Sequence, residues 1–448
     1  MANEVNKKYQ IDTEENKQFL RENTETLLAF GHKFPSPGGG SYYLGDDGTP
    51  WKDRNRETWI TCRMAHVYSL GVMLGHDGSE QLVDAALRGL TGELHDDING
   101  GWYAGLTKDG EIVPSKQCYA HAFVLLAASS AMQAKRPGAK QLLEEALVLY
   151  DKRFWNEKEG LSVDTWNTEF TKLDPYRGIN ANMHTVEAFL AVADALGDEN
   201  YRCRAGKIID HVIGWAKDNR DRIPEHFTAD WKPDLDKNKE KPDDPFKPYG
   251  ATPGHGIEWA RLITQWAVST YGEKAAAKQY IEAAEDLYNR AVTDAWNADG
   301  APGIVYTTDW EGKPVVHDRM HWTLAEAINT SATLYRVTGN KKYADDYAMF
   351  MQYLDETVLD HSCGSWFHQL DAQRNSMAGQ IRYLSCAAGN ADPLSEDRCI
   401  DRNGSAGIIF RSGKKKRGRN PVSLICYTDK SVLIYRYCRR QSQPGSVS

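Results

Sequence analysis

A pair of helices in the second half of the chain decides the fold class. The stretch GIEWARLITQWAVST at residues 256–270 and the stretch KAAAKQYIEAAEDLYNRAVTDAW at residues 274–296 both repeat apolar residues at intervals of three and four. This periodicity predicts two consecutive helices, each with one buried face. A connector at Trp296 and Asn297 follows, and residues 303–307 (GIVYT) favour a short strand. The unit is a helical hairpin that needs neighbours to bury its apolar faces.

The same unit repeats along the chain. Helical periodicity is also present at residues 57–75, 117–133, 140–154, 185–195, 200–217, 322–338 and 342–358. Connectors rich in Gly, Asp and Trp lie at residues 100–103, 154–156 and 364–367. Repeated helical hairpins must stack, either as a solenoid or as a closed ring. We predict an all-α fold, an (α/α)6 barrel with short β hairpins in the connecting loops, and a pocket at the N-termini of its inner helices.

Two segments of the chain present the same pair of side chains. His184 stands three residues before Glu187, and His255 stands three residues before Glu258. Each pair follows a turn-forming stretch and opens an apolar run, so both side chains of a pair lie on one face near a helix start. Histidine titrates near neutrality, and a carboxylate can orient it and raise its basicity. The duplication therefore favours proton-transfer chemistry in a single pocket.

The composition is that of a globular protein, with 26% charged and 41% hydrophobic residues. No apolar run reaches the roughly 18–20 residues of a membrane span, and residues 1–17 lack the apolar core of a signal peptide. We expect a cytoplasmic monomer or homodimer that binds neither membranes nor nucleic acid. Cys62, Cys118 and Cys203 fall in helical patterns without CxxC spacing, so buried, reduced thiols are expected.

Five motifs in order resemble those of the N-acylglucosamine 2-epimerase superfamily, and within it the aldose–ketose isomerase branch of mannose and sulfoquinovose isomerases. The resemblance covers residues 30–373, and its motifs are TWITCRM (58–64), SKQCY (115–119), NANMH (180–184), GHGIEW (254–259) and GSWF (364–367). It implies an (α/α)6 barrel, 1,2-isomerisation of a sugar or epimerisation at C2, and no metal or other cofactor.

The resemblance also implies roles for individual residues. Arg63 would bind sugar hydroxyls and stabilise developing oxyanion charge, and His255, supported by Glu258, would act in ring opening and proton transfer. His184 would face the sugar as a second acid or base. The side chains expected to line the pocket or bind substrate are Trp59, Tyr119, Asn180, Glu187, Trp322, Glu326 and Gln369. Isomerisation through a cis-enediol needs such a base, a proton donor and a cation.

The substrate is expected to be a neutral hexose. Sulfoquinovose isomerases carry an arginine-rich segment before the Gly-His motif, whereas residues 244–249 here (DPFKPY) contain one Lys and no Arg. A sulfonate would prefer a planar, multidentate guanidinium. His368 and Gln369 also follow the mannose isomerase pattern. D-mannose to D-fructose is the favoured reaction, with D-lyxose to D-xylulose as a possible side activity.

Other interpretations of these residues remain open. Sulfoquinovose isomerase and N-acylglucosamine or aldose 2-epimerase are the closest alternatives, and a protein-binding member of the family is a non-enzymatic one. His184, Glu187, His255 and Glu258 are acceptable ligands for a divalent ion. Glu187, Glu258 and Glu326 could instead serve a glycoside hydrolase, although the His residues argue for proton shuttling. His66, His121, His226 and His321 are expected to be packed or surface histidines. The charged connector 226–249 is a solvated loop or a lid over the pocket.

The end of the chain departs from the family. Residues 377–448 contain 13 Lys and Arg against 5 Asp and Glu, a net charge of +8, whereas the whole chain has −8. Four of the eight cysteines and the run KKKRGR at 414–419 also lie there. The family is expected to continue into a last helix with the pattern Trp-x-x-Lys-x-Asp-Ile-Tyr-His, whose His is an essential acid or base, but no His follows His368.

A frameshift near Arg374 explains this departure. One base out of register, the codons of residues 380–393 can encode Lys-Ser-Asp-Ile-Tyr-His-Ala-Leu-Gln-Ala-Thr-Leu-Ile-Pro, which restores the family pattern. We therefore divide the chain into a sugar isomerase barrel at residues 1–375 and a basic, non-family tail at 376–448 that is the product of a frameshift. The rival interpretation is a tail that binds nucleic acid or an anionic surface.

Overall fold

The fold is a double ring of helices. The computed structural model describes residues 6–244, 246–272, 274–373 and 375, together with the strands β18 (Leu424–Thr428) and β19 (Ser431–Tyr435). In this described part, the inner helices are α2 (Thr58–Leu74), α4 (Cys118–Gln133), α6 (Ile179–Leu196), α8 (Pro253–Tyr271) and α10 (His321–Thr338). The outer helices are α1 (Glu14–Phe30), α3 (Ser79–Leu90), α5 (Ala139–Arg153), α7 (Glu199–Asp218), α9 (Ala275–Ala295) and α11 (Lys341–Tyr353).

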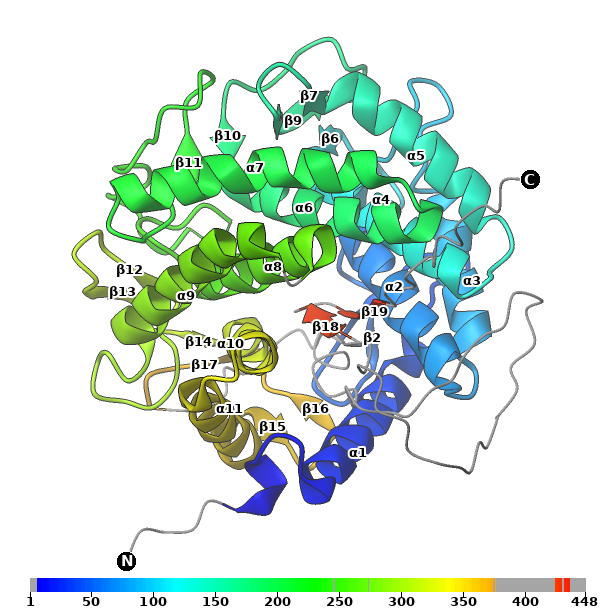
Figure 1. The fold of residues 1–448 in the computed structure, drawn as a ribbon. Coiled ribbons are helices and arrows are strands. Elements are labelled where there is room, and N and C mark those ends of the chain that lie inside the picture. Colours follow the sequence, from blue (N-terminus) through cyan, green and yellow to red (C-terminus); the bar gives the residue numbers. More distant parts are fainter. Residues whose placement is uncertain are drawn as a thin grey trace, which may run out of the picture.

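The sequence separates the two rings. Helix α4 is buried on all sides from Ala120 to Ala131, as a helix surrounded by others must be. Helix α9 instead buries one stripe, which includes Ala284, Leu287, Tyr288 and Ala291 at spacings of three and four. Each inner helix packs on the next one, from α2 through α4, α6 and α8 to α10, and also on the outer helix that follows it (Figure 1). The predicted architecture is confirmed.

Short antiparallel strand pairs connect the helices, also as predicted. They are formed by β1 (Tyr43–Leu44), β2 (Pro50–Trp51), β3 (Arg56–Glu57), β4 (Gly105–Leu106), β5 (Ile112–Val113), β6 (Ser115–Gln117), β7 (Trp155–Asn156), β8 (Leu161–Ser162), β9 (Thr165–Asn167), β10 (Arg177–Gly178), β11 (His226–Phe227), β12 (Thr307–Thr308), β13 (Pro314–Val316), β14 (Arg319–Met320), β15 (Leu359–Asp360), β16 (Ser365–Trp366) and β17 (Gln369–Leu370). Strands β3, β6, β10 and β14 run directly into α2, α4, α6 and α10. Each of these four strands is paired, so the start of each of these inner helices is fixed.

Two details of the sequence interpretation need correction. Helix α6 begins at Ile179 rather than at Thr185, so His184 lies in its second turn, whereas His255 lies in the first turn of α8. The stretch resembled a turn because of its asparagines, but Asn182 bonds to the backbone N–H and C=O of Ser162 at 2.8 and 3.0 Å and is satisfied inside the helix. Cys62 and Cys118 are buried as expected, but Cys203 is exposed, because it lies off the buried face of α7.

The ring of inner helices is bordered by α10 on one side and α2 on the other. Between them lies the antiparallel hairpin of β18 and β19, with β18 against α10 and β19 against α2 (Figure 1). The predictions for the rest of residues 376–448 fall outside the described residues. Among the residues that the structure describes, no helix is both long enough and apolar enough to cross a membrane.

Candidate active site

The first turn of every inner helix in the described part presents one partly exposed side chain. These residues are Trp59 on α2, Tyr119 on α4, Asn180 on α6, His255 on α8 and Trp322 on α10, each the second or third residue of its helix. All five were predicted site residues. Between their first and last turns these helices are almost entirely buried, so the inner ring meets solvent at its two ends, and all five residues lie at the N-terminal end.

Arg63 lies one turn below Trp59 on α2. Its guanidinium lies 4.5 Å from the ring centre of Trp59 and 4.8 Å from that of Phe123, and its Nη2 donates a hydrogen bond to the Tyr119 hydroxyl at 2.9 Å. Aromatic faces attract a cation without neutralising it. The cation is therefore held beside two predicted sugar-binding residues, which suits a group that binds hydroxyls or stabilises an oxyanion.

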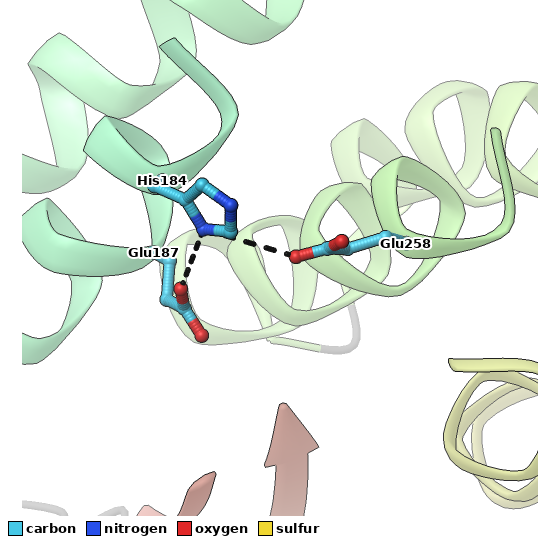
Figure 2. A group of neighbouring side chains, drawn as sticks. All are labelled: His184, Glu187 and Glu258. Atoms are coloured by element: carbon cyan, nitrogen blue, oxygen red, sulfur yellow. Dashed lines mark hydrogen bonds and ion pairs between the residues drawn. The ribbon is translucent and has the colours of Figure 1, made fainter. Parts of the chain in front are cut away.

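His184 is buried and lies between two carboxylates. Its Nδ1 is 3.0 Å from Glu187 Oε2 and 4.0 Å from Glu258 Oε1, which belongs to the neighbouring helix α8 (Figure 2). The rings of Tyr119 and Phe123 pack against the imidazole at centroid distances of 5.1 and 4.7 Å. A carboxylate at Nδ1 favours the tautomer with a proton on Nδ1 and a lone pair on Nε2. The expected pairing with Glu187 is confirmed.

A buried ion pair, which the sequence did not predict, lies next to Glu258. Arg261 donates from Nε and Nη2 to the two carboxylate oxygens of Glu326, at 2.8 and 3.1 Å, and its Nη2 is 3.7 Å from Glu258 Oε1. Burial opposes its charge, but the carboxylates of Glu326 and Glu258 raise the pKa of Arg261 above its usual value. Both oxygens of Glu326 thus accept from Arg261 in a fully buried pair, which differs from the expected sugar-facing role. A lone Arg in the apolar run of residues 256–270 was the available signal.

His255 is oriented by a different carboxylate from the expected one. Its Nδ1 lies 3.0 Å from each of the two carboxylate oxygens of Glu225, a buried residue just before β11, whereas Glu258 lies at His184 and Arg261. The imidazole packs against Trp322 with ring centres 5.2 Å apart, and Tyr306 contacts Trp322 edge-on at 6.2 Å. The predicted pairing of His255 with Glu258 was wrong, because a spacing of three residues shows only that two side chains share a helix face. It does not show which side chains from other segments contact them.

Gln369 is placed beside the start of α10. It pairs with Met320 in the β14–β17 ladder, and its side-chain amide donates to Asp318 at 2.6 Å. Its strand partner Met320 lies two residues before Trp322, so Gln369 lies at the same end of the ring as the other site residues.

The remaining histidines named in the sequence analysis are packed ones. His66, His121, His226 and His321 are all buried. Burial lowers the pKa of His66 to about 3, although Glu187 acts in the opposite direction, and burial also lowers that of His121 to about 3. His226, the first residue of the charged connector 226–249, hydrogen-bonds to the Tyr176 hydroxyl at 2.8 Å and to the Pro248 carbonyl at 2.9 Å. These bonds hold the two ends of the connector together. Whether this connector acts as a lid stays a prediction.

His184, Glu187 and Glu258 could also hold a metal ion. One ligand atom from each residue lies within 4.8 Å of the others. The guanidinium of Arg261 beside Glu258 weakens this fit, since a cation already neutralises one of the three donors. His255, the fourth candidate ligand, does not belong to the group found in the described residues.

The sequence and the helical ring both match known proteins. The family model of N-acylglucosamine 2-epimerase matches residues 39–383. The chain belongs to the N-acylglucosamine 2-epimerase family. A D-mannose isomerase from Thermobifida fusca is 40% identical over 347 residues, which are 77% of this chain and 84% of that protein.

Solved structures agree with this assignment. A D-mannose isomerase crystal structure matches with a TM-score of 0.78 and 26% identity, over 85% of this chain and 96% of that one. A cellobiose 2-epimerase from Spirochaeta thermophila matches with a TM-score of 0.72 at 19% identity, over 84% of this chain and 96% of that one, which supports the fold alone. The family member described here is an isomerase with an (α/α)6 barrel fold, as the sequence predicted.

Proposed function

We propose that this chain is an aldose–ketose isomerase that interconverts D-mannose and D-fructose without a metal. The observation that carries the proposal is the pair of histidines, His184 and His255, each held at Nδ1 by a carboxylate, with the Arg63 cation linked to His184 through Tyr119. This set supplies two proton-transfer groups and one group for oxyanion charge. The D-mannose isomerases among its relatives give the substrate.

The reaction needs a proton moved between adjacent carbons. A base removes the proton from C2 of the open-chain aldose, the electron pair forms the C1–C2 double bond of a cis-enediol, and O1 gains a proton. The enediol then loses the O2 proton and receives a proton at C1, which gives the ketose. We assign ring opening and proton transfer to His255, which is partly exposed, and a second acid or base role to His184. Such groups typically contribute about 10²–10⁴-fold in rate.

Arg63 stabilises the negative charge that develops on the oxygens of the enediolate. Its guanidinium is held by two aromatic faces and the Tyr119 hydroxyl, so it needs no rearrangement as charge develops. Trp59 and Trp322 offer apolar faces to the sugar from the two ends of the series of inner helices.

A neutral sugar fits this site better than a sulfonated one. Lys247, the one cation at residues 244–249, lies with its Nζ 3.8 Å from the ring centre of Tyr176. A lysine in that position offers a point charge on an aromatic face and not the planar guanidinium that binds a sulfonate through two hydrogen bonds. Isomerisation of sulfoquinovose is therefore the second candidate activity, and an assay with that sugar tests it.

The test is an NMR assay in D2O with EDTA. The purified chain is incubated with D-mannose, and D-fructose with deuterium at C1 is the expected product, because a base that exchanges with solvent carries the transferred proton. Parallel incubations with N-acetylmannosamine, D-lyxose and sulfoquinovose separate the epimerase, pentose and sulfosugar alternatives. Conversion of sulfoquinovose but not D-mannose would contradict the substrate. Activity that EDTA abolishes and added metal restores would contradict the metal-independent mechanism.

We also propose that residues 376–448 are a frameshift product attached to a barrel at residues 1–375. Two observations support it. The outer helix α11 is the last α-helix in the described residues, and the β18–β19 hairpin lies between α10 and α2, where a sixth inner helix would close the ring (Figure 1). The test is to sequence the source DNA and express the chain with the alternative frame restored. A higher isomerase activity in the restored chain is expected. Source DNA without an out-of-frame Tyr-His codon pair would contradict this origin of the tail.

Two other expectations stay predictions. The first is the cytoplasmic location, which fractionation of the native host would test. The second is that the protein is a monomer or homodimer, which light scattering on the purified chain would test.

A further inference from the structure

We infer that Glu225 is a positioning residue of the isomerase site, which sets the tautomer and orientation of His255 and fixes it relative to the helix that carries His184. This inference rests on the proposed function for its kinetic consequence, but not for its structural one. Nothing in the sequence pattern around residue 225 indicated it.

The carboxylate of Glu225 is committed to His255 on both oxygens. Oε1 and Oε2 each lie 3.0 Å from Nδ1, and the Glu225 side chain is 5% exposed. A carboxylate can only accept here, so Nδ1 must carry the proton and Nε2 the lone pair. The base that meets the sugar is then Nε2. A neutral amide in place of the carboxylate could donate to Nδ1 and would permit the opposite tautomer.

The backbone of the same residue holds the start of another helix. The Glu225 carbonyl accepts a hydrogen bond from the N–H of Ile179, the first residue of α6, at 3.1 Å. The next residue, His226, pairs with Gly178 in the β10–β11 ladder. Glu225 therefore cannot move without the start of α6. Glu225 thus links His255 on α8 to the start of α6, the helix that carries His184, in addition to the contact between His184 and Glu258.

The charge of Glu225 reaches the aromatic groups around His255. Burial first, and then Glu225, raise the pKa of Tyr306, which contacts Trp322, and both also raise that of Tyr176. Asp164, Asp174 and Asp234 also raise the pKa of Tyr176. A buried carboxylate is costly unless it is paired. Its pairing with His255 Nδ1 supplies that partner and holds the imidazole with Nε2 free of this carboxylate.

His184 reaches the same arrangement by a different route. Its partner Glu187 is on the same helix, three residues away, whereas Glu225 is thirty residues from His255 and on another element. A helix can present His184 and Glu187 together by its own geometry. The pairing of His255 with Glu225 exists only because β11 is packed against β10, so the tertiary fold of this connector is part of the active site.

The experiment compares Glu225→Gln and Glu225→Asp with the unmodified chain. We expect Glu225→Gln to lower kcat by about 10²–10⁴-fold with KM changed by less than about threefold, because the wrong tautomer removes the base but not the sugar contacts. Glu225→Asp keeps the charge and should recover part of kcat. The acidic limb of the pH–kcat profile should move to lower pH in Glu225→Gln, a shift that a purely structural role would not produce.

A matched control is Glu311→Gln, which removes an exposed carboxylate paired with Arg220 and should leave kcat unchanged. The second readout needs no turnover. Histidine-selective 15N NMR of the unliganded chain should show His255 protonated on Nδ1, with its signal assigned by its loss in His255→Asn, and protonated on Nε2 in Glu225→Gln. An unchanged tautomer in Glu225→Gln, or an unchanged kcat, would overturn the inference. If the chain shows the tautomer change but converts no sugar, even with the alternative frame restored, the result would instead contradict the proposed function alone.

Discussion

The Glu326→Gln substitution separates two roles for this residue. The family resemblance implies that Glu326 contacts the sugar, whereas the structure shows both of its oxygens bonded to Arg261, at 2.8 and 3.1 Å, with both side chains fully buried. Breaking a buried ion pair costs about 3–5 kcal/mol, because one charge is left without its partner. Glu258, 3.7 Å from Arg261, keeps part of the compensation, so we expect about 3 kcal/mol here.

Urea unfolding followed by tryptophan fluorescence measures this loss. The expected result is a lower unfolding midpoint with an unchanged slope, which reports lower stability and an unchanged folded state. The double variant Arg261→Met/Glu326→Leu should recover only part of the loss, since the apolar pair needs no compensation but buried Glu258 loses the guanidinium 3.7 Å away. The exposed pair of Arg220 and Glu311 supplies the control, because Glu311→Gln should keep the wild-type midpoint. The reasoning would be refuted if Glu326→Gln unfolded at the wild-type midpoint and lost turnover of D-mannose, because Glu326 would then be a sugar ligand.

Three further predictions follow from the site. Arg63→Lys should lower kcat by about 10²-fold. The reason is that an ammonium group cannot both donate to the Tyr119 hydroxyl and present a planar face to Trp59. A kcat near that of the wild type would exclude the oxyanion role. Prolonged dialysis against EDTA should leave the isomerase rate unchanged, and a metal-dependent recovery would contradict this. His66 and His121 have their pKa lowered to about 3, so below about pH 6.5 the unfolded chain binds protons that the folded chain does not, and stability should fall as the pH drops from about 6.5 to about 3. His66→Gln should flatten this pH dependence in urea titrations, and an unchanged slope would show that His66 is not the titrating group.

The sequence predicted what depends on periodicity and local spacing. The helical pattern at residues 256–296 predicted a helix pair, whose outer member has one buried stripe. The pairing of His184 with Glu187 was predicted correctly because the two side chains share one helix face. Trp59 belongs to the motif at residues 58–64, and Trp322 opens the helical pattern predicted at residues 322–338; both lie at helix starts in the structure. These features need no knowledge of which segments meet in space.

Contacts between distant segments were not predictable in this way. Glu225 reaches His255 across thirty residues, through a strand pairing of two residues that has no periodic signal. Arg261 was present in the quoted helix, but its partner Glu326 lies sixty-five residues later on α10. Glu258 was predicted to pair with His255 because the two are three residues apart on one helix. In the structure Glu258 instead lies beside His184 of the neighbouring helix and beside Arg261. A single sequence does not distinguish these cases.

Both histidines are paired with a carboxylate at Nδ1, but their exposure to solvent differs. This difference suggests which of the two acts first in the proposed reaction. The side chain of His184 is 1% exposed and that of His255 is 15% exposed. Ring opening begins on a cyclic sugar that has just arrived from solvent, so the more accessible imidazole in the first turn of α8 is the one that can meet it. His184 lies one turn deeper and packs against Tyr119, so we expect it to meet the sugar only after the sugar has displaced water from the helix starts. Proton transfer in a site that excludes water avoids loss of the enediol to side reactions. With the roles proposed for them, His255 would open the sugar ring at the rim of the site and His184 would act as the second acid or base one helical turn below it.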